Sequence, residues 1–324
     1  MKPKVIVYKK VDLSVLHLLR EHCELTYYEK LDAETYPTFV KQLHHAHGLM
    51  GSGLKVDKAL LEQAPHLKVV SNISVGYDNL DLPELSARGI MATNTPNVLN
   101  DTVADTIMGI MLAAARRITE LDRYVKDGKW KSQIGEKEFG VDVHHKTLGI
   151  IGMGGIGASI AQRAYFGFGM NILYHNRSRK PEYEQKYSAR YCSMDELLQQ
   201  SDFVCLMTPL TPETVKLIGE REFKLMKKSA IFINGSRGAT VDEDALVHAL
   251  KNKEILAAGL DVYLQEPVPE DHPLLSLENA VTVPHIGSAT YETRMGMAML
   301  AAENLISGLR GELPPNLLNK EFSK

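Results

Sequence analysis

Short runs of apolar, often β-branched residues alternate with amphipathic stretches along the whole 324-residue chain. Strands that are buried on both faces appear as continuous apolar runs, whereas helices repeat their apolar positions every three or four residues. The alternation therefore predicts parallel sheets with helices on both faces. Two successive sets of such units can be separated along the chain.

The first set predicts a small doubly wound lobe. Its expected strands are Lys4–Tyr8, Gly48–Met50, Leu67–Ser71 and Ile90–Thr93, and its expected helices are Leu13–Glu21, Ala33–His44, Asp57–Gln63 and Leu82–Ala87. Apolar positions then recur at helical spacing from Val98 to Asp127, just before Gly128. This stretch predicts one long helix that leads into the second set.

The second set predicts a complete dinucleotide-binding sheet of six parallel strands. These strands are Thr147–Ile151, Asn171–Tyr174, Phe203–Met207, Ala230–Asn234, Ala257–Asp261 and Ala280–Thr282. A last helix, Tyr291–Leu309, is expected to pack back on the first lobe. The expected fold is α/β with two doubly wound domains: a Rossmann domain at 99–287 inserted in a flavodoxin-like substrate domain formed by 1–98 and 288–324.

Composition narrows the class of protein. Lys and Arg total 37 against 40 acidic residues, so the net charge of −3 offers no basic surface to a nucleic acid or an anionic membrane. The apolar stretch Ile107–Ala115 is shorter than the roughly 18 residues of a membrane span. Three scattered cysteines suggest neither disulfides nor a zinc site. We therefore expect a cytoplasmic protein that binds neither nucleic acid nor membrane.

A glycine motif follows the first strand of the second set. Thr147–Ile151 runs into Gly152-Met-Gly154-Gly155-Ile156-Gly157, which opens a predicted helix. In this strand–turn–helix context the glycines allow a tight turn, close approach of the backbone to a pyrophosphate, and close helix packing. Phosphate oxygens then meet free N–H groups at the helix N-terminus. The motif predicts a nicotinamide dinucleotide site.

The end of the next strand indicates which dinucleotide binds. NAD-preferring sites carry Asp or Glu there to hold the ribose hydroxyls. This chain has Asn176-Arg177-Ser178-Arg179 instead, and two guanidinium groups with a hydroxyl suit a 2′-phosphate. NADP(H) is therefore expected, with NAD(H) as the alternative if the two arginines only face solvent.

Three later strand ends of the second set carry polar residues, at the edge where open α/β sheets place their ligands. The segments are Asn234–Gly238, Asp261–Pro267 and Pro284–Ser288. Together with the glycine motif and Ser74-Val75-Gly76-Tyr77-Asp78-Asn79, they resemble the D-isomer-specific 2-hydroxyacid dehydrogenases over nearly the whole chain. Within that family the resemblance is to glyoxylate/hydroxypyruvate reductases, including those that also reduce 2-ketogluconate (gluconate 2-dehydrogenase).

The resemblance implies that Arg237, Glu266 and His285 are catalytic. It also implies that the N–H groups of Val75 and Gly76 bind the substrate carboxylate, together with Arg237 and His285. Further cofactor contacts implied in this way, beside the glycine motif and residues 176–179, are Pro209, Gly235, Asp261, Gly287 and Ser288. Asp261 would hold the nicotinamide carboxamide, although an Asp at this point can also be a turn cap.

The chemistry suits these residue types. Reduction of a 2-keto acid places negative charge on the carbonyl oxygen, so a donor that titrates near neutral pH is needed beside it, and histidine is such a donor. A carboxylate on the other ring nitrogen, here Glu266, fixes the tautomer and favours the imidazolium. Arg237 can bind the substrate carboxylate and polarise the carbonyl.

Other features make weaker claims. The histidines at 44, 45 and 47 and at 144 and 145 lack metal-ligand partners, so no metal site is expected. Family members have an arm that embraces a partner subunit in the region of Trp130, which favours a homodimer. Gly155 stands where many members carry Arg, so one side-chain contact to the pyrophosphate is missing.

Two alternatives remain open at this point. One is an NAD-linked relative that acts on D-lactate, D-glycerate or a phosphorylated acid. The other is a dinucleotide-sensing binding protein like the corepressors that share the fold. A test of 2-keto acids with both cofactors separates all three.

Overall fold

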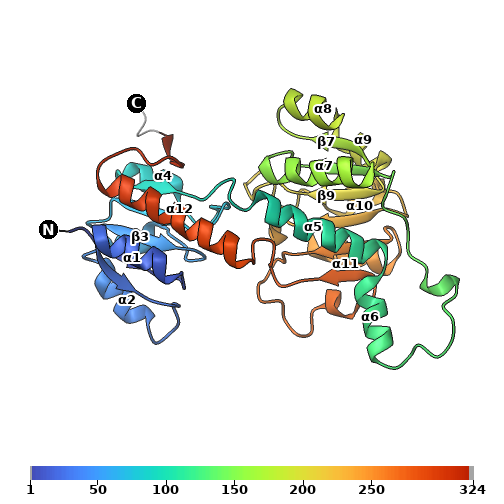
Figure 1. The fold of residues 1–324 in the computed structure, drawn as a ribbon, viewed down its shortest axis with the longest axis horizontal. Coiled ribbons are helices and arrows are strands. Elements are labelled where there is room, and N and C mark those ends of the chain that lie inside the picture. Colours follow the sequence, from blue (N-terminus) through green and yellow to red (C-terminus); the bar gives the residue numbers. More distant parts are fainter. Residues whose placement is uncertain (1, 321–324) are drawn as a thin grey trace. The chain divides into compact units, whose positions relative to one another are not determined.

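The computed structural model describes residues 2–320, which divide into two compact units (Figure 1). The first unit takes the chain up to Leu99 and resumes at Ala289, and the second runs from Asn100 to Ser288. The second unit is thus inserted into the first along the sequence.

The first unit is built on a parallel sheet of five strands in the order β2-β1-β3-β4-β5. The strands are β1 (Lys4–Val7), β2 (Glu24–Tyr27), β3 (Gly48–Gly51), β4 (Val69–Asn72) and β5 (Met91–Thr93). The helices are α1 (Leu13–His22), α2 (Tyr36–Leu43), α3 (Lys58–Leu61), α4 (Leu82–Ala87) and α12 (Tyr291–Leu309). This strand order is that of flavodoxin-like sheets.

Local sequence explains where these helices begin and what they bury. Asp12, Asp57 and Asp81 each accept a backbone N–H of the first turn of α1, α3 and α4. Thr290 caps α12 in the same way. α12 packs against β3, β4 and α1, and Phe39 of α2 lies fully buried on a core cluster with Tyr8 and Leu49.

The second unit is built on a parallel sheet of seven strands in the order β12-β11-β10-β9-β6-β7-β8. The strands are β6 (Thr147–Ile151), β7 (Asn171–His175), β8 (Arg190–Tyr191), β9 (Phe203–Leu206), β10 (Ile231–Asn234), β11 (Ala257–Leu260) and β12 (Ala280–Thr282). Read from β8, this is the 3-2-1-4-5-6 order of Rossmann sheets with one strand added. The predicted fold class is confirmed.

The helices of the second unit follow the same alternation. They are α5 (Asn100–Ala115), α6 (Ile118–Lys126), α7 (Gly155–Phe168), α8 (Pro181–Tyr187), α9 (Met194–Gln200), α10 (Glu220–Leu225) and α11 (Glu243–Lys251), with the short 3₁₀ turns η1 (Glu136–Glu138), η2 (Gly238–Thr240) and η3 (Pro273–Ser276). α5 packs against α7, β10 and β11, so its apolar face is largely buried.

The prediction of one long helix from Val98 to Asp127 is wrong, because the helix breaks between α5 and α6. The carbonyl of Ala115 accepts the N–H of Val141 at 2.8 Å, and Arg117 adopts a left-handed conformation with φ of 55°. The Arg117 guanidinium binds Glu120 and the carbonyl of Lys137. The returning segment around residue 140 therefore takes the hydrogen bond that would have continued the helix.

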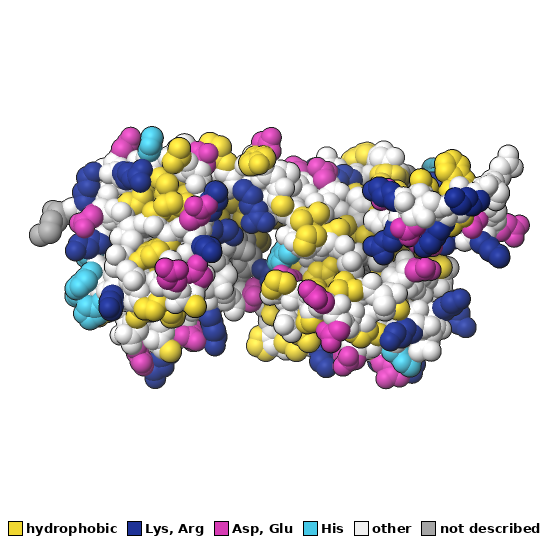
Figure 2. Space-filling view, turned by 90° about the horizontal axis from the view of Figure 1, so that it is seen from below, with side chains coloured by type: hydrophobic (Ala, Val, Ile, Leu, Met, Phe, Trp, Pro, Cys, Tyr) yellow, Lys and Arg dark blue, Asp and Glu magenta, His cyan; other side chains and the backbone are white. Residues whose placement is uncertain are grey.

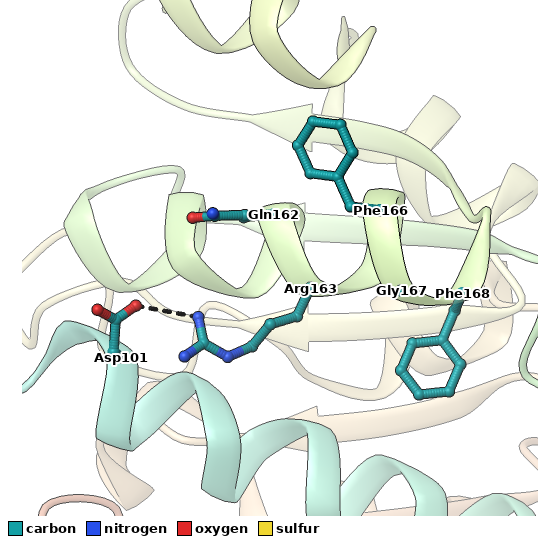
Figure 3. A pocket seen from close by; sticks show the side chains of 6 residues that line it. All are labelled: Asp101, Gln162, Arg163, Phe166, Gly167 and Phe168. Atoms are coloured by element: carbon teal, nitrogen blue, oxygen red, sulfur yellow. Dashed lines mark hydrogen bonds and ion pairs between the residues drawn. The ribbon is translucent and has the colours of Figure 1, made fainter.

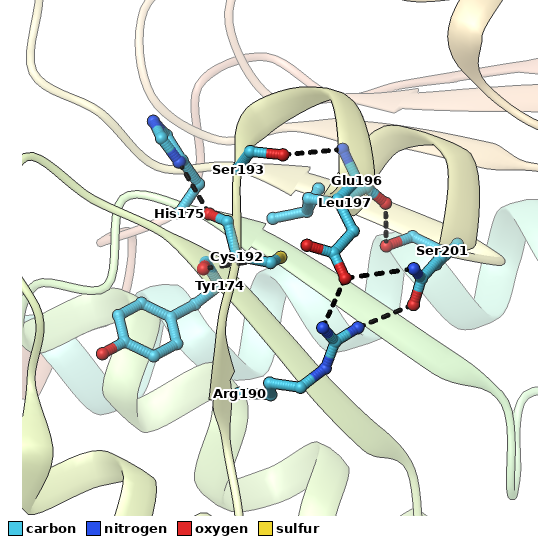
Figure 4. Close-up of polar contacts among 9 residues, drawn as sticks. Tyr174, His175, Arg190, Cys192, Ser193, Glu196, Leu197 and Ser201 are labelled. Carbon is cyan, nitrogen blue, oxygen red and sulfur yellow. Dashed lines mark hydrogen bonds and ion pairs between the residues drawn. The ribbon is translucent and has the colours of Figure 1, made fainter.

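Two short edge strands, β2 and β8, were also not predicted. β8 has only two residues, and polar contacts fix the chain beside it (Figure 4). His175 Nδ1 lies 2.9 Å from the carbonyl oxygen of Cys192, and Arg190 binds Glu196 and Gln200. Such strands lack the long apolar run of a central strand, so the hydrophobic pattern does not mark them.

The surface of each unit carries charges of both signs. Lys, Arg, Asp and Glu side chains are intermingled over the face seen in Figure 2. Across residues 2–320, no helix combines the length and the hydropathy that crossing a membrane demands.

Candidate active site

Three neighbouring strands of the second unit bring the predicted catalytic loops to one edge of the sheet. β10, β11 and β12 are adjacent and parallel, so their carboxyl ends point the same way. Arg237 follows β10, Glu266 lies in the loop after β11, and His285 follows β12.

His285 and Glu266 form a direct pair. His285 Nδ1 lies 2.7 Å from Glu266 Oε2, and the second carboxylate oxygen accepts the N–H of Tyr263 at 3.0 Å. A carboxylate only accepts, so Nδ1 carries the proton and Nε2 is left as the atom for proton exchange. The side chains are 46% and 36% exposed, so a small molecule can reach them.

Asp261 fixes the loop that carries His285 by accepting two of its backbone N–H groups. Its carboxylate accepts the N–H groups of Ile286 at 2.6 Å and Gly287 at 2.8 Å, and His285 has a φ of 51° in the left-handed region. Burial raises the pKa of Asp261, while the two N–H bonds act in the opposite direction. The geometry is that of a turn cap, and the predicted contact with the nicotinamide stays a prediction.

The Arg237 loop is fixed by a buried amide and touches the Glu266 loop. Asn234 accepts from the N–H and the hydroxyl of Ser236 and donates to the carbonyl of Arg237 at 3.1 Å. A Cβ on Gly238 would lie 1.9 Å from the carbonyl carbon of Tyr263, so only glycine allows the two loops to meet. Arg237 donates from Nη1 to the carbonyl of Ser236 at 2.9 Å.

Two residues that build this site, Tyr263 and Asn234, were not predicted as site residues. Tyr263 orients Glu266 through its N–H, and its buried hydroxyl donates to the carbonyls of Leu260 and Val283. Burial raises the pKa of Tyr263 to about 12, so it stays a donor. The hydrophobic pattern marks Asn234 only as the end of a strand, although an amide at a buried strand end is a signal for a loop anchor.

The glycine motif forms the turn that a pyrophosphate requires. Gly152 has a φ of 102°, and a Cβ there would lie 2.7 Å from the carbonyl of Met207. Gly154 caps α7, whose first residues are Gly155, Ile156 and Gly157, so N–H groups at the start of a 14-residue helix face the loop. The backbone therefore offers the cradle that phosphate oxygens would fill.

One observation beside the glycine motif fits a bound dinucleotide, and another concerns position 155. Among the described residues, the buried Oγ1 of Thr208 has no hydrogen-bond partner, and Thr208 lies beside Gly152 and before Pro209. A Cβ on Gly155 would lie 2.5 Å from Nδ2 of Asn100. Asn100 thus occupies the space where a side chain at 155 would begin.

The loop after β7 holds the residues predicted to select the cofactor. The side-chain amide of Asn176 accepts the N–H of Met153 and donates to its carbonyl, so it connects this loop to the glycine motif. Arg179 is paired with Glu184 through Nε at 3.0 Å and Nη2 at 2.6 Å. Among residues 2–320, Arg177 has no hydrogen bond and no ion pair within 4 Å, although its positive charge helps to lower the pKa of Glu213.

In the first unit, the predicted carboxylate-binding loop follows β4. The carbonyl of Val75 accepts from Asn94 and that of Gly76 accepts from Asn72, each at 2.8 Å. The N–H groups of Val75 and Gly76 have no acceptor among the described residues. The side-chain amides hold the loop by its carbonyls and leave both donors for an anion.

The remaining predicted cofactor residues lie on the loops of the second unit. Pro209 accepts the Thr214 hydroxyl through its carbonyl, Gly235 packs on Ile107, and Gly287 lies against Asp261. Ser288 ends the unit. In the described part of the chain, no three His, Cys, Asp or Glu side chains are grouped as metal ligands.

A hollow on α5 and α7 is separate from these residues (Figure 3). It is lined by Asp101, Gln162, Arg163, Phe166, Gly167 and Phe168. Arg163 binds Asp101 at 3.0 Å and Asp105 at 2.6 Å, so its charge serves to join the two helices. None of the predicted site residues lines this hollow.

A dinucleotide-binding sheet with a glycine-motif turn, and a histidine–carboxylate pair beside an arginine loop, define the class of nicotinamide-dependent oxidoreductases. The model of the family "D-isomer specific 2-hydroxyacid dehydrogenase, NAD binding domain" matches residues 108–287. The chain belongs to this family.

Curated and solved relatives extend the match to the whole chain. A glyoxylate/hydroxypyruvate reductase B of Klebsiella pneumoniae is 52% identical over 321 residues, or 99% of each chain. A crystal structure of a Thermus thermophilus protein is similar with a TM-score of 0.90 at 41% identity, covering 97% of this chain and 99% of that one. An NADPH-dependent glyoxylate/hydroxypyruvate reductase of Sinorhizobium meliloti, in complex with NADP and malonate, has a TM-score of 0.85 at 31% identity, covering 98% and 97%.

Proposed function

We propose that this protein reduces the small 2-keto acids glyoxylate and hydroxypyruvate to 2-hydroxy acids with NADPH. The observation that carries the proposal is the 2.7 Å contact between His285 Nδ1 and Glu266, which leaves Nε2 as a proton donor. The relatives named glyoxylate/hydroxypyruvate reductase support this substrate class.

Each residue has a task in the proposed reaction. When bound, NADPH would supply the hydride for the carbonyl carbon. His285 gives the proton on Nε2 to the carbonyl oxygen, and Glu266 stabilises the imidazolium through Nδ1. Arg237 binds the substrate carboxylate and polarises the carbonyl, and the N–H groups of Val75 and Gly76 bind the same carboxylate.

We propose that Arg177, Ser178 and Arg179 bind the 2′-phosphate of NADP(H). The loop has no carboxylate in the place where an NAD site would need one, and the guanidinium group of Arg177 makes no hydrogen bond within the described chain. An Arg177→Asp variant should reverse the preference between NADPH and NADH. An unchanged ratio of kcat/KM values for the two cofactors would refute this assignment.

One experiment tests the proposed function. The purified protein is assayed for loss of nicotinamide absorbance with glyoxylate, hydroxypyruvate, pyruvate and 2-ketogluconate, each with NADPH and with NADH. We expect glyoxylate and hydroxypyruvate with NADPH to give the highest kcat/KM values. No turnover of any 2-keto acid would reject the proposal, and a preference for NADH with pyruvate would favour a D-lactate-type enzyme.

We also propose that the protein is a cytoplasmic homodimer. α6 and the segment after it expose apolar side chains that an isolated chain would leave in water. These are Ile118, Val125, Trp130, Ile134 and Phe139, which are 51–60% exposed. Light scattering after size-exclusion chromatography should give twice the chain mass of 36.1 kDa, and Trp130→Ser should weaken the dimer. A wild-type monomer would rule this out.

A further inference from the structure

A lysine and a serine form a contact at the carboxyl edge of the first unit's sheet. The N–H of Tyr8 donates to the carbonyl of Met50 at 3.0 Å, so the chain still runs beside β3 when it reaches Lys9. Lys9 Nζ then donates to Oγ of Ser52, the residue after β3. The two side chains therefore meet where β1 and β3 end.

This contact is next to the predicted carboxylate-binding loop. Gly51, the last residue of β3, is in register with Asn72 of β4, and its carbonyl accepts the N–H of Ile73 at 2.7 Å. The loop that bears Val75 and Gly76 starts directly after these residues. The lysine–serine pair and the two N–H donors thus share one sheet edge, on neighbouring strands.

The charge of Lys9 is not balanced within the described chain. Lys9 is half-buried, and no carboxylate of residues 2–320 lies within ion-pair distance of it. Its pKa is lowered, first by desolvation and then by the like charge of Arg294 at the start of α12. Keeping a cation partly desolvated beside another cation is costly, and such an arrangement is typical of a ligand site.

We propose that Lys9 and Ser52 bind the 3-hydroxyl group of hydroxypyruvate, an inference that rests on the proposed function. The ammonium group of Lys9 can only donate a hydrogen bond, and Ser52 Oγ can accept one. A hydroxyl group accepts and donates at once, so it can bind beside the pair, accepting from Lys9 and donating to Ser52. Glyoxylate has no third carbon and gains nothing from the pair, whereas pyruvate would place a methyl group against it.

The test measures discrimination among three acids of matched chemistry. We compare kcat/KM with NADPH for hydroxypyruvate, pyruvate and glyoxylate in the wild type, Lys9→Met and Ser52→Ala. A hydrogen bond to a charged group is worth enough to change kcat/KM by about ten- to a hundredfold. The ratio of hydroxypyruvate to pyruvate should therefore fall at least about tenfold in Lys9→Met and less in Ser52→Ala, while the ratio of glyoxylate to pyruvate stays the same.

Lys10→Met is the matched control, because Lys10 carries the same charge one residue away but is exposed and paired with Glu29 at 2.6 Å. It should leave all three ratios unchanged. If Lys9→Met lowers all three acids by one factor, Lys9 only attracts anions or supports the fold, and the proposal is overturned. Ser52→Ala keeps the charge and remains decisive if Lys9→Met does not fold. A wild type that turns over no 2-keto acid would instead reject the proposed function.

Discussion

The two units differ in the chemical groups that they place after the carboxyl ends of their parallel strands. In the second unit, these groups are side chains: Glu266 and His285 form a pair, and Arg237 extends from an adjoining loop. In the first unit, the loop after β4 offers main-chain N–H groups, and buried amides such as Asn72 hold it by its carbonyls. Apart from proline, a substitution can delete a side chain but not a backbone N–H. We therefore expect the second unit to lose chemistry outright on mutation and the first to lose affinity by degrees.

The largest expected effect is on the second unit. His285→Ala removes the proton donor, so kcat/KM with glyoxylate should fall by about 10²–10⁴-fold. NADPH binding, followed by fluorescence titration, should change little. His248→Ala is the control, because His248 is an exposed imidazole on α11 of the same unit. Full activity in His285→Ala would contradict the assignment of the donor.

A smaller, different effect is expected in the first unit. Asn72→Ala removes the donor to the Gly76 carbonyl and leaves buried polar groups unpaired, at a cost of about 1–3 kcal/mol in the free energy of unfolding. The looser loop should raise the KM for glyoxylate roughly five- to tenfold with little change in kcat. Steady-state kinetics and urea unfolding measure both. A fall in kcat with unchanged KM would contradict the expectation that the first unit contributes to affinity and the second unit to the chemical step.

The loop after β7 offers a third case, in which one side chain, Glu184, acts by fixing another, Arg179. Tyr174 donates to Glu184 at 2.6 Å and accepts the N–H of Lys180 at 2.7 Å, while Glu184 binds Arg179. Glu184→Ala should free Arg179 and weaken NADPH binding about three- to tenfold, with NADH unchanged. Glu182→Ala, on the same helix but exposed, is the control. Tighter NADPH binding in Glu184→Ala would show that Glu184 competes with the phosphate instead.

The smallest effect concerns pH. Because burial raises the pKa of Asp261 above its ordinary value of 3.8, the folded protein keeps a proton on it at pH values where the unfolded chain has lost one. The contribution of Asp261 to stability should fall as the pH rises from 3.8 to the higher folded value and stay constant above it. The difference in Tm between the wild type and Asp261→Asn, measured against pH, should show this slope. A flat difference would disprove it.

Much of the fold follows from the hydrophobic pattern, because central strands and amphipathic helices leave strong periodic signals. α4 and α12 have the bounds that the pattern predicts, and the two strand orders are those of the expected sheets. The edge strands β2 and β8 and the break at Arg117 depend on tertiary hydrogen bonds, such as that from Val141 to Ala115. No local pattern of residues encodes these contacts.

The candidate site also contains some residues that the sequence predicts and others that only the tertiary contacts reveal. His285 and Glu266 follow strand ends and were assigned through the resemblance to a known family, and the structure places them in contact. Residues that position them are harder to find. Tyr263 acts through its N–H, so its side-chain type does not reveal the contact, whereas Asp261 forms the turn cap that an Asp at this point can form.

The insertion of one unit within the other also orders events during synthesis. A ribosome completes all of residues 100–288 before it reaches α12, the helix that packs on β3 and β4. The sheet of the first unit therefore lacks α12 over β3 and β4 until the second unit has been translated. A nascent polypeptide halted before Tyr291 would have a complete dinucleotide-binding sheet and an apolar surface for chaperones to shield.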